Sequence, residues 1–460
     1  MLQNQVYERF VEQRPVPVMT RLLLETVLSP QKLDELFGKV AKEQYTRELL
    51  FSSIVALMTA VVFRIHPSVN AAYQAEKEKL PVTIQSVYNK LNGVEPITAS
   101  ELVRHTYRQL EPVIHEMGGQ TQDWLPGYQV KVLDGNHLAA TEHRLLELRD
   151  VAAGPLPGLS VAVLDCSTMM VQDVLLCEDG HAQERSLLPE ILQLVRKGQV
   201  WIGDRGFCTS YFLHGIAKGD AFFIIRQHAT NAPWEPAGTR KRIGRAETGT
   251  LYEQSIRIWA EDGSKLMARR LTLELDKPTR DNETELHLLT NLPRRAAPAR
   301  KVAELYRSRW TIETAFQQLT VDLRCEVDTL AYPRAALFGF CVAVAAFNIL
   351  STIKAAIRAE HGHEAADSLS SFYLTHEILR TYDGMMIAIA PVDWEPMQQL
   401  SSQEVAQEVK RLASRIRLSR FRKSIRGPKK LITPRTRYQS KPHVSTAKLL
   451  AKRERAAKQR

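Results

Sequence analysis

Cysteine is scarce in this sequence and occurs in no pattern that would cross-link the chain or bind metal through sulfur. There are five cysteines in 460 residues, an odd number, and no two of them form a Cys-x-x-Cys pair. This argues against a disulfide framework and against a structural zinc site. We expect a protein of a reducing compartment, the cytoplasm.

A long apolar run is also missing. The longest, residues 335–347, has 13 residues and is bounded by Arg334 and Asn348, whereas a helix that spans a membrane needs about 20. We therefore expect a buried helix there and no membrane partner. Residues 1–15 contain acids and no apolar stretch of the kind found in secretion signals, so we expect no signal peptide.

Acidic residues are nearly absent from the last part of the chain. Residues 410–460 contain 19 Lys and Arg but one acid, Glu454, a net charge of +18, whereas residues 1–409 carry −7. A basic segment attracts polyanions, and this one lacks the wide apolar face of a helix that lies on a membrane. We expect residues 401–460 to form a helix and then a basic tail that is disordered until it binds nucleic acid.

Residues 1–125 are expected to form an all-helical domain, because apolar residues recur through them at helical spacing. Within this domain, residues 80–93 have a Pro and Thr start, an amphipathic turn and a Gly stop. That pattern is typical of the recognition helix of a helix-turn-helix that binds DNA. An ordinary surface helix explains it equally well, and the 13 bases and 14 acids of residues 1–126 supply no basic face.

From residue 126 the pattern changes to short apolar strands that alternate with helices. Residues 126–226 and 285–400 are expected to form one α/β domain, a mixed sheet with flanking helices. A β-rich insertion at residues 227–284 would interrupt it. The second part of the domain would begin with a strand and continue with two long helices, over about 297–325 and 334–358.

Two aspartates directly follow apolar strand patterns. Asp134 ends the run Tyr128–Leu133 and precedes Gly135, and Asp204 ends the run Gln199–Gly203. Acids at the ends of neighbouring strands of an open sheet point into the crevice where such sheets bind ligands. Each pattern is also typical of an ordinary turn, since Asp-Gly and Gly-Asp-Arg-Gly are common turn sequences.

A glutamate with polar neighbours at helical spacing lies further along the chain. On a single helix, Tyr306, Arg309 and Glu313 would face the same side, beside an apolar stripe. The alternative is a local Arg309–Glu313 ion pair that contributes about 0.3 kcal/mol. Asp134, Asp204 and Glu313 together would suit phosphodiester chemistry. Two Mg²⁺ ions about 4 Å apart can align a nucleophile and stabilise the leaving oxygen, and Mg²⁺ prefers carboxylate ligands.

These motifs together resemble the DDE transposases of the insertion-sequence-four family. Tyr306, Arg309 and Glu313 match the first three positions of that family's Tyr-Arg-Glu-Lys signature, and the segments that begin at Asp134 (Asp-Gly-Asn) and Asp204 (Asp-Arg-Gly-Phe) are similar to its aspartate motifs. The resemblance implies an α/β, RNase H-like catalytic domain with a five-stranded mixed sheet, and a β-rich insertion between the second Asp and the Glu.

The resemblance also implies cut-and-paste transposition of an insertion sequence. Asp134, Asp204 and Glu313 would bind two Mg²⁺ (or Mn²⁺) ions, while Tyr306 and Arg309 would hold a phosphate beside the cleaved bond. Double-stranded DNA would be nicked at the transposon end, released through a hairpin as in family members, and joined to target DNA. A homodimer would bring the two ends together, on the nucleoid of a bacterial cytoplasm.

The fourth position of the signature departs from the family. Lys is expected seven residues after Glu313, where this sequence has Thr320, which brings no charge. Arg324, one helical turn further on, is the candidate for the missing cation that would bind phosphate. Two other functions remain open: a transposase-derived protein without catalytic activity, and a regulator that only binds DNA and in which the acids are structural.

Overall fold

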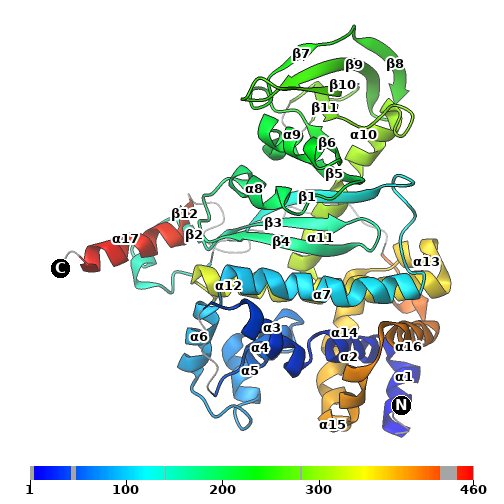
Figure 1. Ribbon diagram of the computed structural model, residues 1–460. Helices are drawn as coiled ribbons and strands as arrows, with labels where there is room; N and C mark the ends of the chain where they lie inside the picture. Colours follow the sequence, from blue (N-terminus) through cyan, green and yellow to red (C-terminus); the bar gives the residue numbers. More distant parts are fainter. Residues whose placement is uncertain (1–4, 43–47, 140, 280–281, 425–442, 459–460) are drawn as a thin grey trace.

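The computed structural model describes residues 5–42, 48–139, 141–279, 282–424 and 443–458 (Figure 1). Its N-terminal part is all-helical, as predicted, because apolar residues at helical spacing give each helix a buried face. The helices are α1 (Gln5–Gln13), α2 (Pro15–Val27), α3 (Pro30–Val40), α4 (Phe51–Val62), α5 (Val69–Ala75), α6 (Ile84–Gly93) and α7 (Pro96–Glu116).

The segment with the pattern of a recognition helix is α6. It begins after Thr83, whose hydroxyl accepts a hydrogen bond from the backbone N–H of Ser86 over 3.2 Å and so caps the helix. Val87 and Leu91 are fully buried, so one face of α6 belongs to the core. The predicted helix is confirmed; its binding to DNA stays a prediction.

The central sheet is mixed, as predicted. β1 (Gln129–His137) is antiparallel to β3 (Leu159–Asp165) and parallel to β5 (Gln199–Gly203). On the outer sides, β4 (Met170–Cys177) is antiparallel to β3, and β6 (Phe222–Arg226) is parallel to β5. The chain enters β5 through α8 (Leu188–Leu192) and β6 through α9 (Ser210–Lys218). The expected hairpin is the one formed by β3 and β4.

The sheet does not end after five strands, and this corrects the prediction. β11 (Glu285–Thr290) pairs with β6 on one side and with β10 (Lys265–Leu275) on the other. The β-rich segment therefore continues the same sheet, in the order β4-β3-β1-β5-β6-β11-β10-β9-β7, and the described residues form a sheet of ten strands. The remaining strands are β7 (Trp234–Pro236), β8 (Lys241–Ala246), which pairs with β9, and β9 (Gly249–Trp259). The alternation of polar and apolar side chains predicted the strands of this segment. It could not predict that β11 pairs with β6, because these strands are far apart in the sequence.

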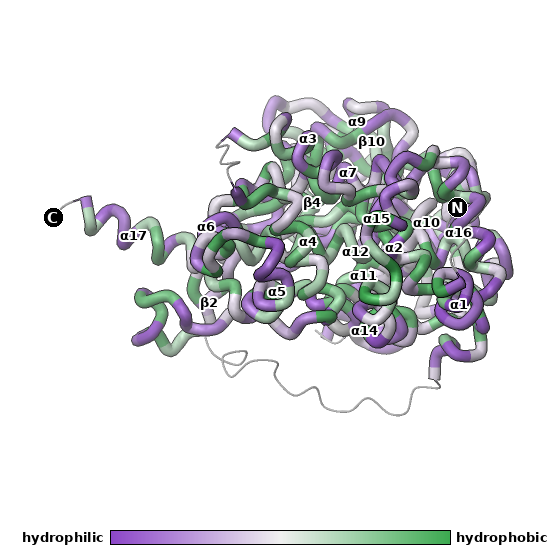
Figure 2. Tube along the Cα trace, turned by 90° about the horizontal axis from the view of Figure 1, so that it is seen from below, coloured by the Kyte–Doolittle hydropathy of each residue, from purple (hydrophilic) through white to green (hydrophobic). Residues whose placement is uncertain are grey.

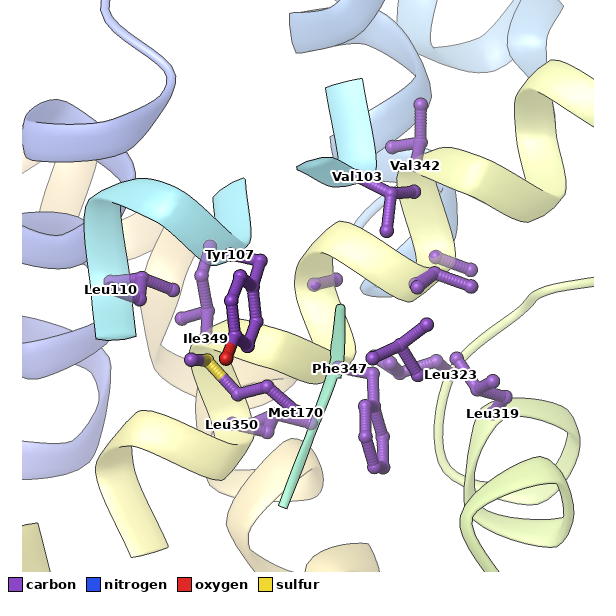
Figure 3. Close-up of a cluster of buried hydrophobic side chains, with 14 of the residues drawn as sticks. Val103, Tyr107, Leu110, Met170, Leu319, Leu323, Val342, Phe347, Ile349 and Leu350 are labelled. Carbon is purple, nitrogen blue, oxygen red and sulfur yellow. The ribbon is translucent and has the colours of Figure 1, made fainter. Parts of the chain in front are cut away.

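The apolar run at residues 335–347 lies in α12 (Pro333–His361), a helix packed against α7 and β4. Among the described residues, α12 is the one helix that is long enough and apolar enough to cross a membrane. Its most apolar stretch is nevertheless wholly buried inside the protein. The prediction of a buried helix is confirmed. Figure 3 shows Tyr107 and Leu110 of α7, Met170 of β4 and Phe347 of α12 gathered in one cluster, so the helical part and the sheet share a core.

The later helices pack on the N-terminal ones. They are α13 (His363–Asp367), α14 (Ser371–Ala388), α15 (Pro391–Trp394) and α16 (Ser402–Ser414), and both α14 and α16 contact α2. Figure 1 shows β7–β10 at one end of the molecule, then the central sheet, then α7 and α12, and these helices with the N-terminus at the other end. In Figure 2, apolar segments such as α4 and α12 lie at the centre and the rim is more hydrophilic.

The basic tail is partly ordered, which corrects the prediction of disorder. β12 (His443–Ser445) pairs in parallel with β2 (Gly154–Leu156), and α17 (Thr446–Lys458) follows it. Leu449 and Leu450 pack on a small apolar cluster that includes Leu145 and Leu148. The tail's charge density predicted disorder, but these two leucines give it an apolar contact. Residues 425–442 of the expected tail lie outside the described residues.

Candidate active site

Asp134 and Asp204 lie on neighbouring parallel strands. β1 pairs with β5 through Val132, and β5 ends one residue before Asp204, so both acids lie at the carboxyl ends of this strand pair. Asp134 was expected to end its strand, but β1 continues to His137 because β3 still pairs with it beyond the end of β5. This pairing holds Asp134 on a rigid element, which a site of fixed geometry needs.

Asp204 has three polar neighbours. Its Oδ1 accepts a hydrogen bond from the backbone N–H of Arg205 over 2.7 Å and caps the short helix Arg205–Phe207. The Tyr306 hydroxyl donates to the same oxygen over 3.2 Å, and Arg226 Nη1 lies 3.9 Å from it. Tyr306 therefore links Asp204 to a segment a hundred residues later in the chain.

The segment with the glutamate is two helices rather than the single helix expected over 297–325. α10 (Ala299–Arg307) ends before a turn at Ser308 and Arg309, and α11 (Trp310–Val321) begins after it. The prediction of a single helix is therefore wrong, because Tyr306 lies in α10, Arg309 in the turn and Glu313 in α11. The three side chains are still neighbours, since the Arg309 guanidinium lies 5.8 Å from the centre of the Tyr306 ring and 2.7 Å from Glu313 Oε1.

Arg309 connects two of the acids. Its Nη2 donates to Glu313 Oε1 over 2.7 Å, and its Nη1 lies 3.5 Å from Asp134 Oδ1. The Arg309 side chain is buried, whereas that of Glu313 is 40% exposed. The local Arg309–Glu313 pair offered as an alternative is present, and it forms one side of a larger cluster. Asp134, Asp204 and Glu313 all surround the pair Tyr306 and Arg309.

Neither Thr320 nor Arg324 forms a hydrogen bond or ion pair with these acids among the described residues, although Thr320 lines the cavity beside them. The Thr320 hydroxyl donates to the carbonyl of Phe316 over 2.7 Å, one turn back in α11. Arg324 follows the end of α11, so it cannot continue the helix face; its side chain donates to the carbonyl of Pro67, and its backbone N–H donates to Val62 over 2.9 Å. Arg324 thus contacts the N-terminal helical part, and the structure does not bring it to the acids.

Burial and crowding of like charges shift the ionisation of the site. Burial, joined by the charges of Glu184, Glu313 and Asp204 and opposed by Arg309, raises the pKa of Asp134 to about 7. Burial also raises the pKa of Tyr306, and the neighbouring Asp204 adds to the effect. For Arg309, burial lowers the pKa, but Tyr306 and the acids around it together outweigh burial and raise it. The carboxylates of the site therefore outnumber the positive charges beside them, and their mutual repulsion favours protonation of Asp134.

A fourth acid, Glu184, lies in this cluster, and sequence reasoning missed it. Glu184 begins the short helix Glu184–Leu187 between β4 and β5. Burial raises its pKa, and the charge of Asp204 raises it further. It follows no strand, so no local pattern singled it out; the signal was in Gly135 and Gly206, which had been interpreted as turn residues and lie against its carboxylate.

The cluster fits a hard divalent cation by its chemistry. Carboxylate oxygens are the ligands that Mg²⁺ and Mn²⁺ prefer, and a cavity of about 1000 Å³ lined by Asn136, Glu184 and Gly206 lies beside the acids. As the side chains stand, no three His, Cys, Asp or Glu of the described chain converge closely enough to bind a metal ion. Arg309 takes up the space between Asp134 and Glu313, so binding of a cation there requires that its side chain move.

Two other acids of the same strands are structural. Asp165 accepts a hydrogen bond from the Tyr107 hydroxyl over 2.5 Å and pairs with Lys131 over 3.2 Å, and all three are buried. Asp173 pairs with Arg104 of α7 over 2.8 Å. These contacts join the sheet to α7 and leave neither acid for a site.

Comparisons with known proteins find similarity to transposases. Residues 157–349 match the family described as the transposase DDE domain. This region contains Asp204, Tyr306, Arg309 and Glu313, and Asp134 precedes it. The chain is also 29% identical over 133 residues to y4zB of Sinorhizobium fredii (strain NBRC 101917 / NGR234), a protein named as a transposase. That match spans 28% of this chain and about a third, 35%, of the relative's length.

A solved structure of low similarity is a chain of the piggyBac transposase synaptic complex with hairpin DNA, determined by cryo-EM. It has 11% identity and a TM-score of 0.39, with 88% of this chain and 86% of that chain covered. A TM-score of this size does not establish a shared fold. The comparisons therefore show that residues 157–349, less than half of the chain, are similar to the transposase DDE domain.

Proposed function

We propose that this protein is a metal-dependent DNA transposase that excises and inserts an insertion sequence, with Asp134, Asp204 and Glu313 as its metal-binding acids. One observation carries the proposal: Tyr306 and Arg309 contact all three acids, which are otherwise up to 179 residues apart in the chain. Two side chains thus connect three motifs that lie far apart in the sequence, as a shared metal site would need.

The order of the central strands supports an RNase H-like catalytic domain of the kind found in the insertion-sequence-four family. In the path β4-β3-β1-β5-β6, only β3 runs against the other four. The first Asp lies on the middle strand, the second follows the adjacent one, and the Glu lies on a helix packed against β1. Strands β7 to β10 of the extended sheet correspond to the insertion at residues 227–284, and β11 begins the second part of this domain.

In this proposal the acids, Arg309 and Tyr306 have different roles. Bound divalent cations would align the attacking hydroxyl and stabilise the leaving oxygen. Arg309 holds Asp134 and Glu313 before the cations bind, and its guanidinium, once released, can donate two N–H groups to a DNA phosphate. Tyr306 fixes the orientation of Asp204 through its hydroxyl. Thr320 supplies no charge, so in this protein the phosphate is held without the signature lysine.

The substrate in this proposal is double-stranded DNA, at transposon ends and at the target, and a homodimer would pair the two ends. The exposed bases of α17 and the remaining basic tail would contact DNA phosphates. A transposase-derived protein that binds DNA without cleaving it is the alternative. The departure at Thr320 favours this alternative, because it removes one phosphate-binding charge.

A cleavage assay separates the two functions. The full chain is incubated with duplex DNA that carries the ends of its own element, with Mg²⁺, with Mn²⁺ or with EDTA. The transposase gives metal-dependent nicks at the ends, and these are lost in D134A, D204A and E313A but retained in D220A, a change at an exposed acid. DNA binding by the wild-type protein without cleavage in any metal would establish the alternative.

A further inference from the structure

The two aspartate motifs of the site each contain a glycine that lies directly against the Glu184 side chain. A Cβ added to Gly135 would overlap Glu184 Oε1, and one added to Gly206 would overlap Glu184 Oε2. Neither glycine has a positive φ, so the backbone conformation does not require glycine at these positions. A side chain at either position would instead force the Glu184 carboxylate to move from its place.

This places the Glu184 carboxylate between the loops that carry Asp134 and Asp204. Gly135 directly follows the first aspartate, and Gly206 is two residues after the second. The charge of Glu184 acts on Asp134, and that of Asp204 acts on Glu184. The Glu184 carboxylate thus lies beside both aspartate motifs, near the carboxyl ends of β1 and β5.

Glu184 has no partner that explains this placement as a structural one. Within the described residues its carboxylate accepts no hydrogen bond and has no cation within ion-pair distance; His137 and Arg309 act on it only from further away. The structural acids of the same sheet differ, since Asp165 and Asp173 each have a close cationic partner. A half-buried carboxylate among acids, without a cation, is unfavourable unless a cation is supplied.

We infer that Glu184 is a fourth carboxylate of the metal site, which binds a divalent cation together with Asp134 and Asp204. The inference rests on the proposed function, because it uses the same cation. It assigns a role to Gly135 and Gly206: their missing side chains let Glu184 reach the two aspartates. The metal centre would then draw on both strand ends, α11 and the short helix before α8.

Titration of the metal-free full chain with Mn²⁺ alone, followed by calorimetry, tests this without DNA or activity. E184Q should weaken Mn²⁺ binding about 10- to 100-fold, as the loss of a coordinating or supporting group does. The matched control is E190Q, a change at an exposed acid on the next helical turn, which should bind Mn²⁺ as the wild type does. D204N serves as the reference for loss of a primary metal-binding acid.

A second test displaces the Glu184 carboxylate without removing its charge, and it has its own control. G206A should displace Glu184 and weaken Mn²⁺ binding like E184Q, whereas G93A, at a glycine with open space around it, should not. Thermal unfolding in EDTA checks folding: E184Q should melt no lower than E190Q, because removal of one charge from crowded acids relieves repulsion.

The possible results distinguish the role of Glu184 from the metal site of the proposed function. Unchanged Mn²⁺ affinity in both E184Q and G206A, with a clear loss in D204N, overturns the role of Glu184 and leaves the proposed function intact. Unchanged affinity in D204N as well overturns the metal site of the proposed function. A lower melting temperature of E184Q in EDTA together with wild-type affinity would assign Glu184 to the fold.

Discussion

The guanidinium of Arg309 donates to the carboxylate of Glu313 over 2.7 Å, and the same group lies 3.5 Å from Asp134. In the absence of a metal ion, Arg309 is the cation that these acids share. Its buried position and its four charged or polar neighbours tie it to the site rather than to solvent. The first prediction concerns the loss of this cation.

Arg309→Ala should destabilise the metal-free protein and increase its response to metal. The loss leaves Asp134 and Glu313 without their shared partner, which costs about 2–4 kcal/mol. Urea unfolding in EDTA and in Mg²⁺ measures both effects, and Mg²⁺ should recover more stability in the variant than in the wild type. Arg307→Ala is the control, since its exposed pair with Glu247 contributes less than about 1 kcal/mol. Equal gains from Mg²⁺ in variant and wild type would contradict the prediction.

Tyr306→Phe should separate the orientation of Asp204 from the packing of the ring. The phenylalanine fills the same space, so stability should change by about 1 kcal/mol or less, the value of one hydrogen bond. DNA nicking should fall about tenfold, because Asp204 loses the hydroxyl that fixes its Oδ1. Single-turnover nicking and thermal unfolding measure the two quantities. If the variant unfolded so readily that the loss of folded protein accounted for the loss of nicking, Tyr306 would serve the fold and not the site.

Asp165→Ala should have the opposite effect to Tyr306→Phe, a large loss of stability and no loss of nicking by the folded protein. It removes the partner of the buried Lys131 and the acceptor of Tyr107, and an uncompensated buried charge costs about 3–5 kcal/mol. Nicking per folded molecule should stay unchanged, as measured at low temperature with the folded fraction determined by circular dichroism. Loss of nicking in fully folded Asp165→Ala would place this acid in the site.

These contrasts show what the sequence could predict. Asp134 and Asp204 were identified because apolar strands end near them, and Tyr306, Arg309 and Glu313 because of their helical spacing and then a resemblance. The single helix assumed for the last three was wrong, since a turn at Ser308 and Arg309 separates α10 from α11. Local patterns describe strands and helices, but the meeting of distant segments is decided by the core.

The other failures have the same origin. Glu184 was missed because its position depends on how the loop after β4 crosses the ends of β1 and β5. The five-stranded sheet was wrong because a strand's second edge can accept a further strand that no sequence pattern announces. The order in the tail was missed because Leu449 and Leu450 find their apolar cluster 300 residues earlier in the chain.

Asp322→Asn should stabilise the protein at high pH and not at low pH. Burial, opposed by Lys354 and Arg64, raises the pKa of Asp322 to about 6. A raised carboxyl pKa means that stability is fully present below the unfolded value near 4 and is lost as the pH rises through about 6. The variant avoids this loss, so it should gain about 3 kcal/mol at pH 8 and nearly nothing at pH 4. Urea unfolding at both pH values decides; a gain of equal size at pH 4 would exclude ionisation as the cause.

Deletion of residues 424–460 should weaken non-specific DNA binding and flatten its dependence on salt, because each lost phosphate contact lowers the log–log slope by about 0.9. The structure divides the bases of α17 into two groups. Lys448 pairs with Asp179 over 2.8 Å and Arg453 with Glu147 over 2.6 Å, so these two are already neutralised.

The other bases of α17 form the second group, Lys452, Arg455 and Lys458, which are exposed and have no ion pair among the described residues. Substitution of all three by alanine should lower the slope by about 2–3, measured by fluorescence anisotropy on an unrelated duplex between low and moderate salt. The double variant of Lys448 and Arg453 should change the slope by less than half as much, because two acids compete with DNA for these side chains. Equal slopes for the two variants would mean that α17 leaves its place on β2 when DNA binds, since only then would all five bases be free to contact phosphate.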